Sequence, residues 1–164
     1  MNTAMNTAMN IVEYSNSYSK EVTDVFYQSV HAIDNGLYSL EQKSVWAPYP
    51  IDYQKWQTRL RLKSPYVLLI NERIAGFIEL EDDGHIDCMY VLPKFQRRSV
   101  GSELLKYTIH KAKAQGITQL YVEASLVAKP LFERFGFVCK QKNRVRINNV
   151  VLENYTMTLR IDRV

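Results

Sequence analysis

One stretch near the middle of the chain, residues 90–105, constrains the fold more than any other. It runs from the apolar end of a predicted strand through Pro93 into a basic segment, Gln96-Arg97-Arg98, and past Gly101 into a helical pattern. Such a turn presents unpaired backbone N–H groups at the positive end of a helix dipole, where a phosphate can bind. Gly101 has no Cβ and allows a close approach to the backbone. The stretch therefore predicts a phosphate-binding strand, turn and helix; a solvated loop is the alternative.

Hydrophobic periodicity and turn residues predict the other elements. The first helix is expected from Ser19, as N-cap, to Asn35-Gly36, and two more are expected over 39–46 and 52–62. A fourth helix should follow the basic turn and end at Gly116. A fifth should follow Ser125, with a late first turn because of Pro130. Strands are expected over 11–14, 66–70, 73–81, 85–91, 119–123, 137–147 and 150–159. The strands before the basic turn form an antiparallel meander, and the helix after the turn makes strand 119–123 parallel to strand 85–91. The predicted fold is α/β with a mixed sheet.

Composition predicts one globular domain. The chain has 164 residues, of which 46% are hydrophobic and 23% charged. The Met-Asn-Thr-Ala repeat in residues 1–10 buries nothing and is predicted to be a disordered extension, which leaves residues 11–164 as the domain. No apolar run approaches a membrane span and no leader pattern begins the sequence, so we expect a cytoplasmic protein without a membrane partner. Cys88 and Cys139 have no metal-ligand spacing, and we expect no metal.

The formal charge of +4 predicts an anionic partner, which a polyanionic cofactor or a nucleic acid would satisfy. Lys140, Lys142, Arg144 and Arg146 alternate along a predicted strand, and alternation would point all four to one face. A solvated sheet face explains this pattern, and a basic wall near an acidic ligand is the alternative. Because no recognition-helix or zinc motif is present, nucleic acid is not the expected partner.

Two segments resemble motifs of the GCN5-related N-acetyltransferase (GNAT) family. The basic turn is similar to the acyl-CoA-binding motif Gln/Arg-x-x-Gly-x-Gly/Ala, with Gln96 and Gly101 in the first and last places and Ser99 in place of the middle glycine. Ser99 must therefore avoid a positive φ or carry strain. Residues 120–137 resemble the family's later motif of a strand, a small polar residue, a helix and Gly-Phe. The resemblance extends from about Tyr66 onward.

The resemblance implies a mixed, mostly antiparallel sheet with helices on both faces, and acetyl transfer from acetyl-CoA to an amine in a ternary complex. The expected partners are acetyl-CoA and a small amine or peptide acceptor; homodimers are frequent in the family. The main alternative is a noncatalytic acyl-CoA sensor. The residues expected at the cofactor are Met89, Tyr90, Val91, Gln96, Arg97, Arg98, Ser99, Val100, Gly101, Ser102, Ser125 and Phe132.

Catalysis requires a base for the amine, donors for the oxyanion, and in some cases an acid for the thiolate. The candidate catalytic residues are His85, Asp87, Glu123 and Tyr90. His85 stands on the strand where related histone-acetylating enzymes carry a glutamate, although an exposed, idle imidazole would also fit its place beside a turn. At the place of Phe132, members of the family commonly have a tyrosine that donates a proton to the leaving thiolate. Phenylalanine cannot donate a proton, so either Tyr90, Tyr121 or Tyr155 acts as the acid, or no acid is needed.

Strict alternation places His85, Asp87 and Met89 on one face of their strand and Ile86, Cys88 and Tyr90 on the other. On that basis Cys88 cannot easily pair with His85, and a cysteine nucleophile is not expected.

Aromatic residues in the turn-rich segment before the sheet are candidates for the acceptor pocket. Trp46, Tyr49 and Trp56 offer large, stiff surfaces with a polar edge. The alternative is that they close one end of the core. The acceptor pocket would then favour an amine with an apolar or aromatic body.

Overall fold

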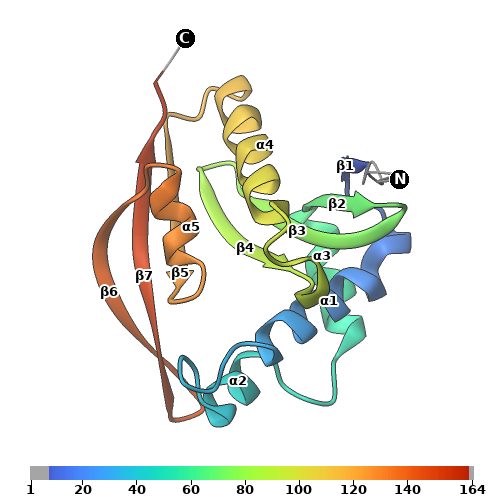
Figure 1. Ribbon diagram of the computed structural model, residues 1–164, viewed down its shortest axis with the longest axis vertical. Coiled ribbons are helices and arrows are strands. Elements are labelled where there is room, and N and C mark those ends of the chain that lie inside the picture. Colours follow the sequence, from blue (N-terminus) through green and yellow to red (C-terminus); the bar gives the residue numbers. More distant parts are fainter. Residues whose placement is uncertain (1–7, 163–164) are drawn as a thin grey trace, which may run out of the picture.

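Seven strands form one sheet in the order β1-β2-β3-β4-β5-β7-β6 in the computed structural model, which describes residues 8–162 (Figure 1). The strands are β1 (Met9–Glu13), β2 (Tyr66–Ile70), β3 (Arg73–Leu80), β4 (His85–Val91), β5 (Gln119–Ser125), β6 (Val138–Ile147) and β7 (Val150–Arg160). The helices are α1 (Ser19–His31), α2 (Leu40–Trp46), α3 (Tyr53–Lys63), α4 (Val100–Ala114) and α5 (Lys129–Arg134), with short 3₁₀ turns at Asn16–Tyr18 and Pro93–Phe95. The pairing of β4 with β5 is parallel and all other pairings are antiparallel, as predicted.

Helices cover both faces of the sheet and define two apolar cores. One core packs α4 and α5 on the sheet, with Leu104, Leu105 and Phe132 fully or almost fully buried. The other packs α1 and α3 on the opposite side through residues such as Val22 and Leu60. The predicted α/β fold with a mixed sheet and helices on both faces is therefore confirmed.

The first helix differs from its prediction at both ends. Ser19 is the first helical residue rather than the N-cap, because the 3₁₀ turn at Asn16–Tyr18 leads directly into α1. Its carbonyl accepts a hydrogen bond from the Thr23 hydroxyl at 2.7 Å. The helix ends at His31, four residues before Asn35.

The last helix begins late, as Pro130 predicted. The backbone N–H of Ala128 donates to the Ser125 hydroxyl oxygen at 3.1 Å, and α5 begins only at Lys129. Ser125 therefore holds the turn that precedes the helix rather than the helical N-cap position.

The final hairpin turns at Asn148 and Asn149, whose φ angles of 47° and 66° fit the expected type I′ turn. Strand β6 contains an irregularity between Cys139 and Gln141 that removes Lys140 from the alternation. The predicted row of four basic residues on one face was therefore wrong, and Lys142, Arg144 and Arg146 form a row of three.

The N-terminal boundary also differs from the prediction. Met9 and Asn10, which were placed in the disordered extension, pair with Ile70 and Leu69 of β2. Residues 1–7 lie outside the described residues. Within residues 8–162, no helix combines the length and apolar character needed to cross a membrane.

Strands β4 and β5 diverge soon after they meet. In the described chain they pair only at His85 with Tyr121 and at Ile86 with Val122. Figure 1 shows β4 turning away from β5 toward the end of the sheet at which α2 lies. The sheet is therefore open at the C-terminal ends of two neighbouring strands.

A glycine in β3 keeps β4 close to its neighbour at this opening. A Cβ on Gly76 would lie 2.8 Å from the Tyr90 carbonyl oxygen and 3.1 Å from Leu104 Cδ1. Backbone cannot move aside as a flexible side chain can. We expect Gly76→Ala to lower the free energy of unfolding by about 1–3 kcal/mol, as overpacking does.

Urea unfolding tests this prediction, with Gly101→Ala as the control. A Cβ at Gly101 would meet the flexible end of Leu131, at 3.0 Å, and would make an ordinary contact with Val91 Cγ2 at 3.9 Å, so that variant should be near neutral in stability. Equal effects of the two substitutions would contradict the importance of the β3–β4 contact.

Candidate functional site

A cavity of about 500 Å³ lies beside the opening, between the start of α4, α5 and the C-terminal end of α1. Ten of the residues predicted at the cofactor line it: Met89, Tyr90, Val91, Gln96, Arg97, Ser99, Val100, Gly101, Ser102 and Ser125. Arg134 from α5 adds a second cationic group, and Asp34 contributes a carboxylate. The basic turn and the later motif therefore meet at one cavity although they are separate in the sequence.

The turn before α4 has a strained backbone. Arg97 and Ser99 have φ angles of 62° and 64°, in the left-handed region that glycine favours. The sequence required Ser99 either to avoid a positive φ or to carry strain, and the structure shows the strained conformation. Its conformation leads directly into α4 at Val100, so the first N–H groups of the helix face the cavity end of the turn. Strain of this kind is concentrated at functional loops.

The end of β4 offers backbone groups to the opening. The Leu92 N–H donates to the Ala75 carbonyl at 2.7 Å, which makes this a hydrogen-bonded pair. In an antiparallel ladder the intervening residues point their N–H and C=O groups the other way. The backbone groups of Met89 and Val91 therefore point toward β5, and the Val91 carbonyl accepts from the Gln96 side chain at 3.2 Å.

Two predicted cofactor residues lie elsewhere. Phe132 is 1% exposed and packs against Phe137 in the core, so its ring does not line the cavity. Arg98 places its guanidinium over the Phe95 ring, 5.6 Å from the centroid, and does not line the cavity either. Both were assigned by motif position, which does not specify side-chain direction.

A second cavity of about 420 Å³ lies between β4, β5 and the final hairpin. His85, Asp87 and Glu123 line it, with an apolar wall of Val145, Ile147 and Leu152. Trp46, Tyr90 and Ser125 line both cavities. The two spaces therefore adjoin at the place where the strands separate.

A bulge in β4 gathers the titratable side chains on one face. Ile78 pairs with Met89 and Leu80 pairs with Ile86, so Glu79 of β3 stands opposite two residues, Asp87 and Cys88. The predicted strict alternation of β4 was therefore wrong. His85, Asp87 and Tyr90 all line the second cavity, whereas Met89 does not. Bulges commonly redirect side chains at functional sites in this way.

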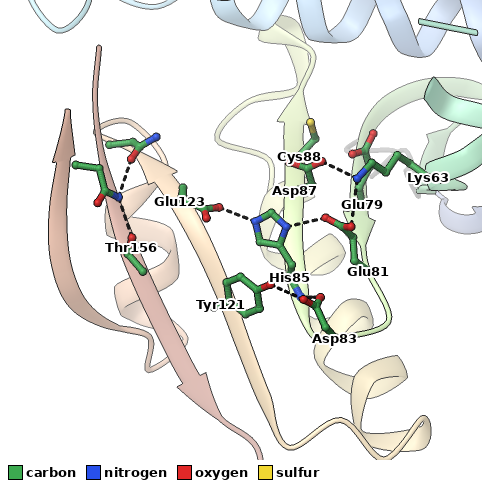
Figure 2. Close-up of polar contacts among 12 residues, drawn as sticks. Lys63, Glu79, Glu81, Asp83, His85, Asp87, Cys88, Tyr121, Glu123 and Thr156 are labelled. Atoms are coloured by element: carbon green, nitrogen blue, oxygen red, sulfur yellow. Dashed lines mark hydrogen bonds and ion pairs between the residues drawn. The ribbon is translucent and has the colours of Figure 1, made fainter. Parts of the chain in front are cut away.

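The His85 ring lies between two carboxylates (Figure 2). Its Nδ1 is 2.7 Å from Glu81 Oε1 and its Nε2 is 2.6 Å from Glu123 Oε2. The ring also stacks on Tyr121, with centroids 4.7 Å apart. Burial alone would lower the pKa of His85, but the hydrogen bonds to Glu123 and Glu81 outweigh it and raise the pKa above 6.5.

Asp87 belongs to a network of ion pairs. Arg59 Nη2 lies 2.8 Å from Asp87 Oδ2 and 2.8 Å from Glu79 Oε2, and Lys63 Nζ lies 3.0 Å from Asp87 Oδ2. Burial would raise the pKa of Asp87, but Lys63 and Arg59 lower it overall. Asp87 is therefore an ionised, paired carboxylate, which makes it a weaker candidate for a base than the His85–Glu123 pair.

Cys88 also contacts Arg59, with Sγ 3.2 Å from Nη2. The bulge places Cys88 on the same side as its neighbour Asp87, contrary to the predicted alternation. Burial raises the pKa of the Cys88 thiol well above its ordinary value, so it stays protonated and is not an activated nucleophile.

Tyr90, like Trp46, lines both cavities. Its hydroxyl oxygen accepts a hydrogen bond from Trp46 Nε1 at 3.1 Å, which leaves the Tyr90 proton free to be donated. Burial raises the pKa of Tyr90 well above 10. Of the predicted acceptor residues, Trp46 lines both of these cavities. Trp56 packs on Phe26 and Tyr49 is 80% exposed, and neither lines either of the two cavities.

Several residues of the site carried no sequence signal. The Tyr38 hydroxyl accepts from the Leu126 N–H at 2.9 Å and donates to the Glu153 carbonyl at 2.7 Å, which joins the segment before α2 to β5 and β7. Glu81 and Arg59 contact His85 and Asp87 from other elements. The contacts of Tyr38 and Arg59 are long-range and leave no local pattern in the sequence.

Glu81, His85 and Asp87 have ligand-type atoms within 4.8 Å of one another. Lys63 already contacts both carboxylates, at 3.3 Å and 3.0 Å, and supplies positive charge there. That no metal is required stays a prediction.

A mixed sheet opens between two parallel strands, with a helix start at one cavity and acid–base side chains at an adjoining one. The acetyltransferase (GNAT) domain family matches residues 35–159. The chain belongs to this family, which confirms the prediction from the two motifs and, with it, that the protein is an acyltransferase.

Individual relatives agree. An uncharacterized N-acetyltransferase of Escherichia coli (strain K12), YafP, is 33% identical over 138 residues, which cover 84% of this chain and 87% of YafP. The crystal structure of a GCN5-related N-acetyltransferase from Rhodopseudomonas palustris has a TM-score of 0.87 at 32% identity, covering 93% of this chain and 95% of that one. PaiA N-acetyltransferase from Thermoplasma acidophilum, solved with coenzyme A, has a TM-score of 0.75 at 17% identity, covering 94% and 99%. At that identity PaiA shows the fold alone.

The strained turn yields a prediction about cofactor affinity. A β-branched residue tolerates positive φ poorly, so Ser99→Val should distort the turn, whereas Ser99→Gly should not. We expect Ser99→Val to weaken acetyl-CoA binding at least about tenfold, roughly 1.4 kcal/mol, in calorimetric titration.

Ser64→Val is the matched control, since Ser64 has a φ of 45° at the end of α3 and lines neither cavity. That variant should lose stability but keep cofactor affinity. Unchanged affinity in Ser99→Val would contradict the role of the turn.

The raised pKa of His85 predicts a pH-dependent contribution to stability. A histidine whose pKa is higher in the folded state stabilises the protein fully below its unfolded pKa of about 6.5, and loses this contribution as pH rises through the folded pKa. The difference in free energy of unfolding between the wild type and His85→Gln should therefore shrink with rising pH.

Urea unfolding between pH 5.5 and 9 measures this difference, with His110→Gln controlling for loss of an imidazole from the surface of α4. A difference that grows with pH would contradict the assigned contacts of His85.

Proposed function

We propose that the protein transfers the acetyl group of acetyl-CoA to the primary amine of a small molecule by direct attack in a ternary complex. The observation that carries this proposal is the pair of cavities that adjoin at the β4–β5 opening and share Trp46, Tyr90 and Ser125. Two substrates that enter separate cavities can meet there without a covalent intermediate. A peptide amine is the alternative acceptor.

The first cavity suits acetyl-CoA. The pyrophosphate of acetyl-CoA would bind at the start of α4, beside Arg97. The pantetheine amides would pair with the outward backbone groups of Met89 and Val91, and the same N–H groups would stabilise the oxyanion. Two structural neighbours support this use of the fold: the PaiA structure contains coenzyme A, and YncA from Salmonella typhimurium contains acetyl-CoA.

The second cavity suits the amine. An ammonium group must lose a proton before it can attack, and His85 with Glu123 offers a base at the cavity wall. The amine nitrogen then forms a bond to the acetyl carbon, and the carbon–sulfur bond breaks. The nitrogen loses its second proton to solvent, and the leaving thiolate takes a proton from Tyr90 or from solvent, since a thiol of pKa about 8.5 is a tolerable leaving group.

The lining of the second cavity favours an amine with an apolar or aromatic body. Aromatic rings of Trp46 and Tyr90 and the aliphatic side chains of the hairpin surround the carboxylates of Asp87 and Glu123. An acceptor with its own carboxylate would be repelled by these groups. The aromatic rings therefore favour an acceptor with an apolar or aromatic body, and the acidic groups favour an acceptor with an amine and no carboxylate.

The test is a thiol-release assay with acetyl-CoA and a panel of amines, after calorimetric titration with acetyl-CoA, CoA and ATP. We expect an aralkylamine such as phenethylamine to be acetylated with kcat/KM at least about tenfold above that of phenylalanine, its carboxylated analogue. A specific affinity for the CoA compounds without turnover of any amine would favour the noncatalytic sensor.

Initial-velocity kinetics test the route of transfer. Direct attack gives intersecting double-reciprocal lines, and a covalent acetyl-enzyme gives parallel ones. Cys88→Ala should keep the intersecting pattern. Parallel lines that disappear in Cys88→Ala would overturn the ternary-complex mechanism.

A further inference from the structure

We infer that Glu81 is the positioning residue of the catalytic base: it holds His85 so that Nε2, and not Nδ1, faces the acceptor cavity beside Glu123. This inference rests on the proposed function of the same site. It assigns a role to a residue that neither motif includes and that does not itself line the cavity.

The geometry of the ring determines which nitrogen can act. Glu81 Oε1 lies 2.7 Å from Nδ1 and can only accept a hydrogen bond there, so Nδ1 carries a proton. Glu123 Oε2 can likewise only accept at Nε2, so a ring that contacts both carboxylates is the imidazolium. When an acceptor ammonium pairs with Glu123 it replaces Nε2–H there, and Nε2 at the cavity wall is then the nitrogen that loses its proton, because Nδ1–H stays bonded to Glu81. Without a partner at Nδ1, the ring could take either tautomer.

Several contacts fix Glu81 and the ring in this arrangement (Figure 2). The Glu81 backbone N–H donates to the His85 carbonyl at 2.8 Å, and Lys63 Nζ contacts Glu81 Oε2 at 3.3 Å. The His85 ring stacks on Tyr121, with 21° between the ring planes. The turn between β3 and β4 therefore positions the carboxylate and the imidazole together.

The charged and titratable groups around His85 come from four elements. Glu81 and Asp83 belong to the β3–β4 turn, and Asp87 belongs to β4. Tyr121 and Glu123 stand on β5, while α3 contributes Lys63 and Arg59, which contact Asp87. Carboxylates directly contact both ring nitrogens. The cationic groups of Lys63 and Arg59 contact the carboxylates of Glu81 and Asp87 and not the ring itself. The surroundings therefore favour the imidazolium that forms when His85 accepts a proton.

The proton-transfer step follows from this arrangement. The acceptor ammonium binds at Glu123 and gives one proton to Nε2 of neutral His85, while Nδ1–H stays bonded to Glu81. The free amine forms the new carbon–nitrogen bond, the carbon–sulfur bond breaks, and the second amine proton passes through water to the leaving thiolate, which gives the amide and the free thiol. The imidazolium, paired with Glu81 and Glu123, returns its proton to water before the next turnover.

The test uses Glu81→Gln, whose amide oxygen can still accept from Nδ1–H but carries no charge. We expect its kcat to fall at least about tenfold and the acid limb of its kcat profile to move to lower pH, because the imidazolium loses a carboxylate partner. Asp82→Asn is the matched control: it removes an exposed carboxylate from the same turn that contacts neither the ring nor Glu81 within the described residues, and its profile should follow the wild type.

Nitrogen NMR of the histidine ring gives a readout that does not depend on activity. In the wild type with phenethylamine bound and acetyl-CoA absent, neutral His85 should be the Nδ1–H tautomer, and the titration midpoint of His85 should fall in Glu81→Gln. The His85→Gln variant assigns the signal among the three histidines.

The outcomes separate the two proposals. A wild type that acetylates no amine defeats the proposed function, whatever NMR shows. An active wild type in which Glu81→Gln leaves the pH profile, the tautomer and the titration of His85 unchanged overturns the positioning role. A loss of activity in Glu81→Gln with unchanged pH profile and NMR titration also overturns it, because a merely structural defect would have that effect.

Discussion

The separation of β4 from β5 is the constraint on which the rest of the site depends. Two neighbouring parallel strands that pair at only two positions leave backbone hydrogen-bonding groups exposed at the ends of both. Such groups are costly unless they find partners, so the opening is suited to a ligand that carries amides of its own. The strained turn, the start of α4 and the late start of α5 all lie around this opening, which explains why the two motifs converge there.

A buried charge network holds β4 in the shape that the site needs. Glu79 is fully buried, and Arg59 links its carboxylate to Asp87 and Cys88 across the bulge. Burial raises the pKa of Glu79 while Arg59 opposes this shift. Removing Arg59 would leave a buried carboxylate without a partner, which is among the more destabilising changes in a protein. The network therefore fixes the bulge, and the bulge directs His85, Asp87 and Tyr90 to one cavity.

The sequence predicted the features that depend on local chemistry. Periodicity and turn residues were sufficient for nearly every strand and helix, for the parallel crossover and for the Asn148-Asn149 turn. The bulge in β4 was not predictable, because it arises from the mismatch of two strands and not from any residue type. The prediction of side-chain direction failed for a similar reason. Phe132 and Arg98 belong to the motifs, but Phe132 faces the core and Arg98 lies over the Phe95 ring. The contacts of Arg59 and Tyr38 join segments far apart in the chain and could only come from the three-dimensional structure.

The two cavities also differ in charge, and this difference assigns each substrate to its own entrance. Arg97, Arg134 and the start of α4 give the first cavity a positive end, against the single carboxylate of Asp34 among its lining residues. The second cavity presents Asp87 and Glu123, while the carboxylate of Glu153 on its border is paired with Lys142 at 3.1 Å. In the proposed reaction, an anionic acyl carrier and a cationic acceptor would therefore be attracted to different cavities. Because the cavities share only Trp46, Tyr90 and Ser125 among their lining residues, the charge that attracts each substrate would also keep it from occupying the place of the other.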